Sequence, residues 1–205
     1  MPIDPNKHQD IYHYLNRVSP ISIETWYEIA KILYEESFNR GDYFAMIGRR
    51  ENHFGIVLDG IFRAYYANGK GTEYTKTLFT PTSFKTPISF IGAYSSLASA
   101  SINHVNIQAL TNAKILCGRY NQWLSLINRN KEVSEWSRKL VELFFAGKEQ
   151  REFEYLTMQA EERYKRFREQ YPEVENLISQ YYIAQFLGIT PTQLSRVRKK
   201  IFSEK

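Results

Sequence analysis

The chain has 205 residues, of which 43% are hydrophobic, and it carries a formal net charge of +5. This length suits one large domain or two modest ones, and the mild basic excess permits a nucleic-acid partner. Its single cysteine, Cys117, excludes an intrachain disulfide and any cysteine-ligated iron–sulfur or zinc site. Because the start of the chain is polar and no apolar run reaches about 18 residues, we predict a cytoplasmic protein without a signal peptide or membrane span.

The first two-thirds of the chain predict helices followed by strands. Residues 7–36 are predicted to be helical, because apolar residues recur at helical spacing from Ile11 to Leu33. Turn residues such as Asp59-Gly60 then separate short runs rich in β-branched and aromatic residues. These runs predict strands at 54–58, 61–66 and 74–79, with a further pair within 103–120. Short strands separated by such turns are typical of a barrel or sandwich.

A long helix is predicted from about residue 120 to 155, because this stretch has no proline and one glycine. Its apolar positions step by three and four residues and form an a/d seam of two heptads. The seam consists of Val133, Trp136, Leu140, Leu143 and Gly147. We predict that these residues form a parallel homodimer interface; a seam packed on the chain's own β-domain is the alternative. One more helix is predicted at 157–171, ended by Pro172.

The stretch "YYIAQFLGITPTQLSRVRKKI", residues 181–201, contains two short helical segments separated by Gly188. Thr190 is placed as a helix N-cap, Pro191 as the first helical residue, and Gln193 completes a capping box. The apolar residues that follow share one face of the second helix: Leu194, Val197 and Ile201. Two helices joined by a short turn with glycine predict a helix-turn-helix, whose second helix enters the major groove of DNA.

The opposite face of the second helix supplies the candidate DNA contacts. Small polar groups lie at its start, and Arg196 can form a bidentate pair with guanine. The predicted DNA-binding residues are Thr190, Thr192, Gln193, Ser195, Arg196, Lys199 and Lys200. The alternative interpretation is a helical hairpin whose basic end is only solvated.

The order of these elements resembles the Crp/Fnr family of bacterial transcription regulators across nearly the whole chain. The resemblance rests on "GDYF…FGIVLDGIFRAYYANGKG" and "IAQFLGITPTQLSRVRKKI". It implies an α+β fold: a cyclic-nucleotide-binding-like jelly roll with flanking helices at 1–125, a dimerisation helix at 126–155 and a helix-turn-helix domain at 156–205. It also implies a homodimer on a near-palindromic operator, Arg196 as a guanine reader, Thr190 as a phosphate contact, and RNA polymerase as a candidate partner.

The segment that matches the family's phosphate cassette, residues 84–110, departs from the family pattern. Cyclic-nucleotide binders of the family use a Glu for the ribose and an Arg for the phosphate, and this segment contains neither residue type. The two positions fall near Pro87 and Ser101, so we expect no physiological binding of cyclic AMP. A pocket for another effector could use Phe84, Lys85, Ser89, Phe90, Tyr94, Ser96, Ser99 and Ser101. Alternatively, these side chains only fill the β-roll.

Other functional classes find little support. The four histidines are scattered along the chain, so we predict no metal site and no cofactor. No G-x-S-x-G, H-E-x-x-H, P-loop or dinucleotide-binding turn is present, which predicts that the protein is not an enzyme. The remaining rival is a sensory or protein-interaction module that has lost specific DNA binding. It is favoured by the short sequence after residue 201, where a DNA-contacting wing would have to form.

Overall fold

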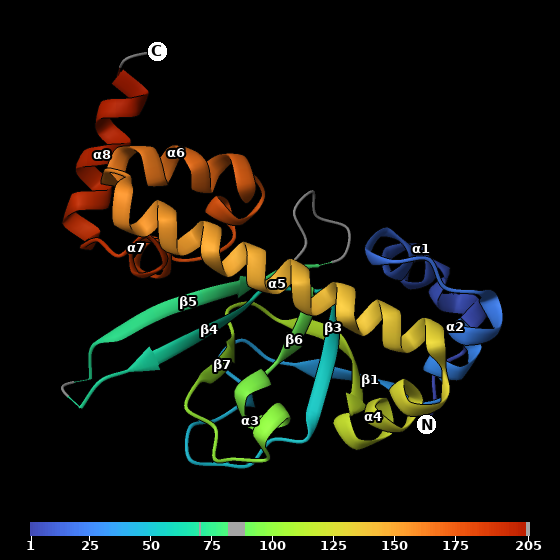
Figure 1. Ribbon diagram of the computed structural model, residues 1–205. Coiled ribbons are helices and arrows are strands. Elements are labelled where there is room, and N and C mark those ends of the chain that lie inside the picture. The colour runs from blue at the N-terminus through green and yellow to red at the C-terminus, as the bar shows by residue number, and fades with distance from the viewer. Residues whose placement is uncertain (70, 82–88, 204–205) are drawn as a thin grey trace.

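The computed structural model describes residues 1–69, 71–81 and 89–203. Figure 1 shows a β-sandwich crossed by one long helix, with a small helical unit at the C-terminal end. The helical elements are η1 (Pro5–His8), α1 (Gln9–Val18), α2 (Ile23–Ala30), α3 (Tyr94–Ser99), α4 (Tyr120–Arg129), α5 (Lys131–Thr157), α6 (Ala160–Gln170), η2 (Val174–Asn176), α7 (Gln180–Leu187) and α8 (Pro191–Ser203). The strands are β1 (Leu33–Phe38), β2 (Tyr43–Ala45), β3 (His53–Asp59), β4 (Phe62–Ala67), β5 (Glu73–Phe79), β6 (Phe90–Gly92), β7 (Asn106–Ala109) and β8 (Ala113–Arg119).

The sandwich consists of two four-stranded antiparallel sheets, in the orders β1-β8-β3-β6 and β2-β7-β4-β5. Side chains alternate between the two faces of each strand. In β4, Phe62 and Ala64 therefore join the core between the sheets, whereas Arg63 faces outward. The strands predicted at 54–58, 61–66 and 74–79 correspond to β3, β4 and β5, and the pair within 103–120 is β7 and β8.

The predicted helix at 7–36 is wrong at its C-terminal end. The helical part divides into α1 and α2, and Ser22 caps α2 by accepting a hydrogen bond from the Thr25 N–H at 3.2 Å. The chain then becomes extended, because Leu33 to Phe38 pair with β8. This pairing joins residues about 80 positions apart in sequence, so tertiary contacts override the local helical spacing.

The predicted helix at 120–155 is also two helices. Asn130 separates them: its side-chain oxygen accepts hydrogen bonds from the N–H groups of Glu132 and Val133, at 3.0 and 3.2 Å. Such a cap satisfies donors that would otherwise be unpaired at the start of α5. The helix predicted at 157–171 begins at Ala160, after α5 has ended.

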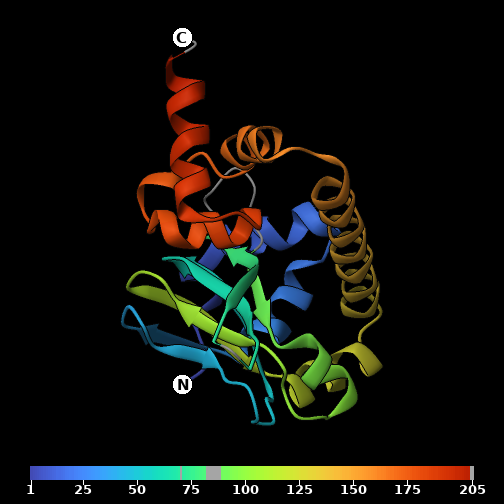
Figure 2. The same ribbon diagram turned by 90° about the vertical axis from the view of Figure 1, so that its left-hand side faces the viewer.

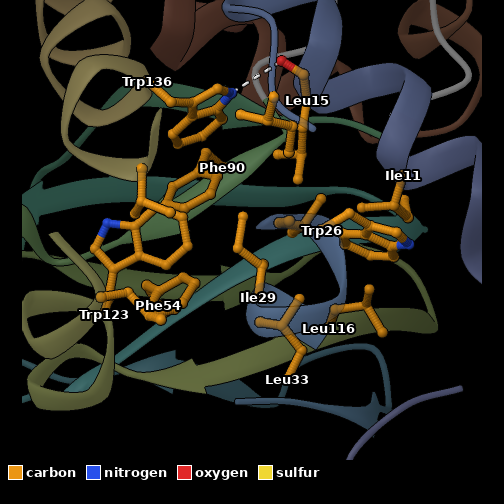
Figure 3. Packing of buried hydrophobic residues seen from close by; sticks show 14 of the residues in the cluster. Ile11, Leu15, Trp26, Ile29, Leu33, Phe54, Phe90, Leu116, Trp123 and Trp136 are labelled. Carbon is orange, nitrogen blue, oxygen red and sulfur yellow. Dashed lines mark hydrogen bonds between the residues drawn. The ribbon is translucent and has the colours of Figure 1, made fainter. Parts of the chain in front are cut away.

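A cluster of aromatic and aliphatic side chains joins the first half of α5 to the sandwich (Figure 3). Trp136 packs against Trp123 of α4 and Phe90 of β6, and the Phe90 ring stacks on Phe54 of β3 at 5.3 Å. The indole N–H of Trp136 donates to the carbonyl oxygen of Leu15 at 2.9 Å. This cluster fixes α1, α4 and the start of α5 on one sheet.

The same cluster corrects part of the predicted dimer interface. Val133, Trp136 and Leu140 are buried within the chain itself, so they are not available to a partner helix. The alternative interpretation, a seam packed on the chain's own β-domain, describes these three residues. Leu143 and Gly147 lie further along α5 and are exposed.

Candidate nucleic-acid interface

The turn between α7 and α8 has two physical reasons to contain glycine. Gly188 has a positive φ of 67°, and it ends α7 in a Schellman motif. In this motif the N–H of Ile189 donates to the carbonyl of Ala184 at 3.0 Å, and the N–H of Gly188 donates to that of Gln185 at 3.3 Å. A Cβ at position 188 would also lie 2.3 Å from the ring of Tyr155 at the end of α5.

The start of α8 has the predicted capping box. The N–H of Gln193 donates to the Thr190 hydroxyl at 3.1 Å, and the Thr190 N–H donates to the Gln193 side-chain oxygen at 2.9 Å. Pro191 follows as the first helical residue, where its missing N–H costs nothing. These local bonds stop α7 and α8 from merging into one helix, so α8 begins in a fixed direction.

One face of α8 is buried against its neighbours and the other is exposed. Leu194 and Ile201 are buried in a cluster with Tyr164 and Phe167 of α6 and with the apolar side chains of α7. The predicted DNA-binding residues lie on the exposed surface of α8 or its cap: Thr190, Thr192, Gln193, Ser195, Arg196, Lys199 and Lys200. The structure therefore brings the whole predicted set onto one helix.

The basic residues of α8 differ in what they contact. Within the part of the chain that the structure describes, Arg196 and Lys199 make no hydrogen bond or ion pair. Lys200, in contrast, lies 2.6 Å from a carboxylate oxygen of Glu161 on α6. Hydrogen bonds from Lys200 and Lys165 lower the pKa of the Glu161 carboxyl. Arg196 and Lys199 are thus the residues of the set best placed to meet an anionic ligand.

A buried carboxylate that the sequence analysis missed holds α8 on its neighbours. Glu175, in η2, accepts hydrogen bonds from the Tyr164 hydroxyl and from Arg168, and Arg198 of α8 lies 3.4 Å away. Burial, and then the hydrogen bond with Glu175, raises the pKa of Tyr164 to about 12. No local spacing could reveal this cluster, because its members come from α6, η2 and α8.

The residues proposed for a ligand pocket divide into several groups, and two of them, Phe84 and Lys85, lie outside the described residues. Ser89 is buried and donates a hydrogen bond to the carbonyl oxygen of Thr80 at 2.8 Å. Phe90 belongs to the core cluster of Figure 3. Ser89 and Phe90 therefore pack inside the fold, and their role in a ligand pocket stays a prediction.

The remaining members of that set lie on α3 or directly after it. Ser96 is buried and its hydroxyl donates to the carbonyl oxygen of Ser101 at 2.6 Å, so it too has a structural partner. The Tyr94 hydroxyl donates to the Phe90 carbonyl at 2.9 Å. The hydroxyls of Ser99 and Ser101 lie 2.8 Å apart near the surface. The alternative interpretation, side chains that fill the fold, fits Ser89, Phe90 and Ser96.

Across residues 1–69, 71–81 and 89–203, no group of three or more His, Cys, Asp or Glu side chains is placed to bind a metal ion. None of the helices in this part of the chain combines the length and the apolar character that crossing a bilayer requires.

No protein-family model and no curated protein sequence matches the chain. Its fold, however, is similar to that of solved transcription regulators. FixK2 from Bradyrhizobium japonicum has a TM-score of 0.70 at 14% identity, with 84% of this chain and 86% of that protein aligned. A regulator from Eubacterium rectale assigned to the crp/fnr family has a TM-score of 0.69 at 14% identity, over 94% and 88% of the two chains.

A third similar structure is the c-di-GMP-responsive global regulator CLP from Xanthomonas campestris. Its TM-score is 0.68 at 12% identity, and the alignment covers 89% of this chain and 93% of CLP. At such identities the likeness is one of fold. It spans the β-sandwich, the long helix and the C-terminal helices together, because most of each chain is aligned.

Proposed function

We propose that this chain, which has the fold of the Crp/Fnr regulators, is a dimeric transcription regulator that binds specific DNA sequences in the cytoplasm. In this proposal α7 and α8 form a helix-turn-helix, and the β-sandwich is a jelly roll of the cyclic-nucleotide-binding type. The observation that carries the proposal is the exposed polar and basic face of α8, whose opposite face is anchored by Leu194 and Ile201.

The exposed face of α8 suits a major groove. Arg196 carries a planar fork of donors that matches the two acceptors of guanine. Thr190 caps a helix N-terminus, where N–H groups favour a phosphate. Lys199, which is exposed, would contact the DNA backbone. Because Arg196 and Lys199 have no partner among the described residues, DNA binding would not require an existing ion pair to break.

The second half of α5 supports the homodimer. Several large apolar side chains there point into solvent: Val141, Leu143, Phe145, Phe153 and Leu156. At 100° per residue, Val141, Phe145 and Leu156 lie within about 60° of one another around the helix axis. Exposed apolar side chains grouped on one face mark sites of protein association. A second copy bound along this half of α5 would bring two recognition helices to a near-palindromic operator, with half-sites roughly 34 Å apart.

The effector is proposed to be something other than cyclic AMP, or absent. The segment 84–110 contains no Glu and no Arg, so the bidentate contact to a cyclic phosphate has no candidate there. RNA polymerase is a further proposed partner, as expected for a regulator of this type. We do not favour an interaction module without DNA binding, because the α8 residues that would contact DNA are all exposed.

The proposal is tested by the affinity of the protein for sequences selected from genomic DNA, measured across a salt series. Arg196→Ala should weaken binding to the selected site by roughly 1–3 kcal/mol and relax the base preference at one position. Arg129→Ala, which removes the same charge from the exposed end of α4, should leave both unchanged. Equal affinity for all sequences in the wild-type protein would favour the interaction module instead.

A further inference from the structure

Arg63 is a buried cation where the β-sandwich meets the α7–α8 unit. It lies on the outward face of β4 and is only 3% exposed. Its guanidinium donates hydrogen bonds to the carboxylate of Glu73 on β5 at 2.7 Å and to the side-chain oxygen of Gln108 on β7 at 3.0 Å. A third bond, at 2.9 Å, goes to Gln185 on α7, 122 positions away in sequence.

Two tyrosine rings contact the guanidinium of Arg63. The ring of Tyr65, on the same strand, has its centroid 3.9 Å from the guanidinium carbon, and the ring of Tyr182, on α7, has its centroid at 4.3 Å. Cation–π contacts of this kind are made more often by arginine than by lysine. The arginine is therefore held by one tyrosine from the sandwich and one from the DNA-binding unit.

Further contacts around Arg63 make this interface continuous. Gln185 also accepts a hydrogen bond from the Thr75 hydroxyl at 3.2 Å, and its amide nitrogen lies 3.4 Å from the Glu73 carboxylate. The apolar side chains of Ile61 and Leu78 belong to the same buried cluster as the core of α7 and α8. Figures 1 and 2 both show α7 lying against β4 and β5, with α8 directed away from the sheet.

This contact specifies one orientation of the DNA-binding unit. A buried cation is stable only while its partners satisfy it, since an unpaired charge in the protein interior is costly. If α7 rotated away, Arg63 would lose Gln185 and Tyr182 together. The docked orientation also leaves the DNA-facing residues of α8 exposed, so docking and DNA binding are compatible.

We propose that Arg63 is a positioning residue that fixes the α7–α8 unit on the β-sandwich in its DNA-binding orientation, and thereby sets the half-site spacing that a dimer prefers. This inference rests on the proposed function. Because the orientation is fixed before DNA binds, the protein loses less conformational entropy when the complex forms. The contacts of Arg63 also connect the sandwich directly to the DNA-binding unit, in addition to the covalent connection through α5 and α6.

The docking itself is tested without DNA. The double variant Lys76→Cys on β5 and Ser203→Cys on α8, both at exposed positions, would carry the spin labels, while the native Cys117 is buried. Labelled chains diluted into unlabelled protein report the distance within one chain. We expect a single narrow distance distribution in the wild type and in the control Arg119→Met, and a broad one in Arg63→Met. A narrow, wild-type distribution in Arg63→Met would overturn the proposal.

The DNA-binding consequence is tested with operators whose half-sites are separated by spacers of different lengths. Arg63→Met should lower the affinity for the best spacer by about tenfold and flatten the preference among spacers, while the base preference persists. Arg119→Met removes the same charge from an exposed position on β8 and should behave as wild type. Tighter binding by Arg63→Met, or an unchanged spacer preference, would contradict the positioning role.

A second variant covers the case in which Arg63→Met does not fold. Gln185→Leu changes the contact from the α7 side and leaves the ion pair between Arg63 and Glu73 intact. It should also flatten the spacer preference, by a smaller factor. If the wild-type chain itself shows no sequence-selective binding, the proposed function fails. If the wild type binds selectively and both variants keep its spacer preference, only the positioning role fails.

Discussion

Both halves of α5 contain apolar residues spaced three or four positions apart, but these residues have different surroundings. Up to Leu140, the apolar side chains are buried against α1, α4 and the sandwich. From Val141 onward the helix exposes large apolar groups, with Val141 65% and Leu156 75% accessible. Periodic apolar residues therefore indicate which face of a helix is apolar, but they do not identify the surface that covers that face.

The contrast also separates two roles within one helix. The first half belongs to the core of its own chain, so its residues should determine stability. The second half combines exposed apolar side chains with contacts to the α7–α8 unit, such as the hydrogen bond from Arg151 to the carbonyl oxygen of Phe186 at 2.6 Å. Its residues should therefore determine association. Three measurements test this division.

The largest expected effect is on the first half. Trp136→Ala would leave a cavity among Trp123, Phe90 and Leu15 and should lower the free energy of unfolding by roughly 3–5 kcal/mol. Denaturant unfolding followed by circular dichroism measures it. Leu124→Ala, at an exposed position on α4, should cost less than about 0.5 kcal/mol. A variant that keeps wild-type stability but becomes monomeric would show that the first half is the interface after all.

The second effect concerns association. The double variant Val141→Glu, Phe145→Glu places two like charges on the exposed face and should raise the dimer dissociation constant at least about 100-fold. Light scattering after size-exclusion chromatography gives the mass, and circular dichroism shows whether the chain remains folded. Leu124→Glu, which adds a charge at an exposed apolar position on α4, is the matched control. An unchanged dimer mass in the double variant would place the interface elsewhere.

The smallest effect is electrostatic and again lies in the first half. Hydrogen bonds from the Thr25 hydroxyl and from Ser22 lower the pKa of the Glu132 carboxyl. A carboxyl whose pKa is lowered by folding stabilises the protein above its ordinary pKa, about 4.3, and this contribution disappears as the pH falls through the folded-state value. Glu132→Gln should therefore lower the melting temperature slightly near neutral pH and have no effect in acid. The control Glu149→Gln, on the exposed second half of α5, should leave the melting temperature unchanged at both pH values. If Glu132→Gln lowered the melting temperature equally at all pH values, the mechanism would be contradicted.

Much of the candidate site could be predicted because its signals are local. Thr190 and Gln193 are three positions apart, and Gly188 ends α7 through bonds that span five residues at most. Turn residues and alternation likewise predicted β3, β4 and β5. The start of β1 could not be predicted in this way, since Leu33 continues a helical spacing and its strand partner is Gly118.

The sequence by itself determined several local elements of this protein: strands β3, β4, β5, β7 and β8, the cap of α8, and the basic face that the cap directs outward. These depend on dihedral preferences and hydrogen bonds among near neighbours. Only the tertiary structure decided which apolar faces are used within the chain and which stay exposed. It also decided that Arg63 would meet Gln185 and Tyr182, and that Glu175 would join α6 to α8. The residues in such contacts are far apart in sequence, so no local pattern relates them. Their burial depends on the whole fold and not on neighbouring residues.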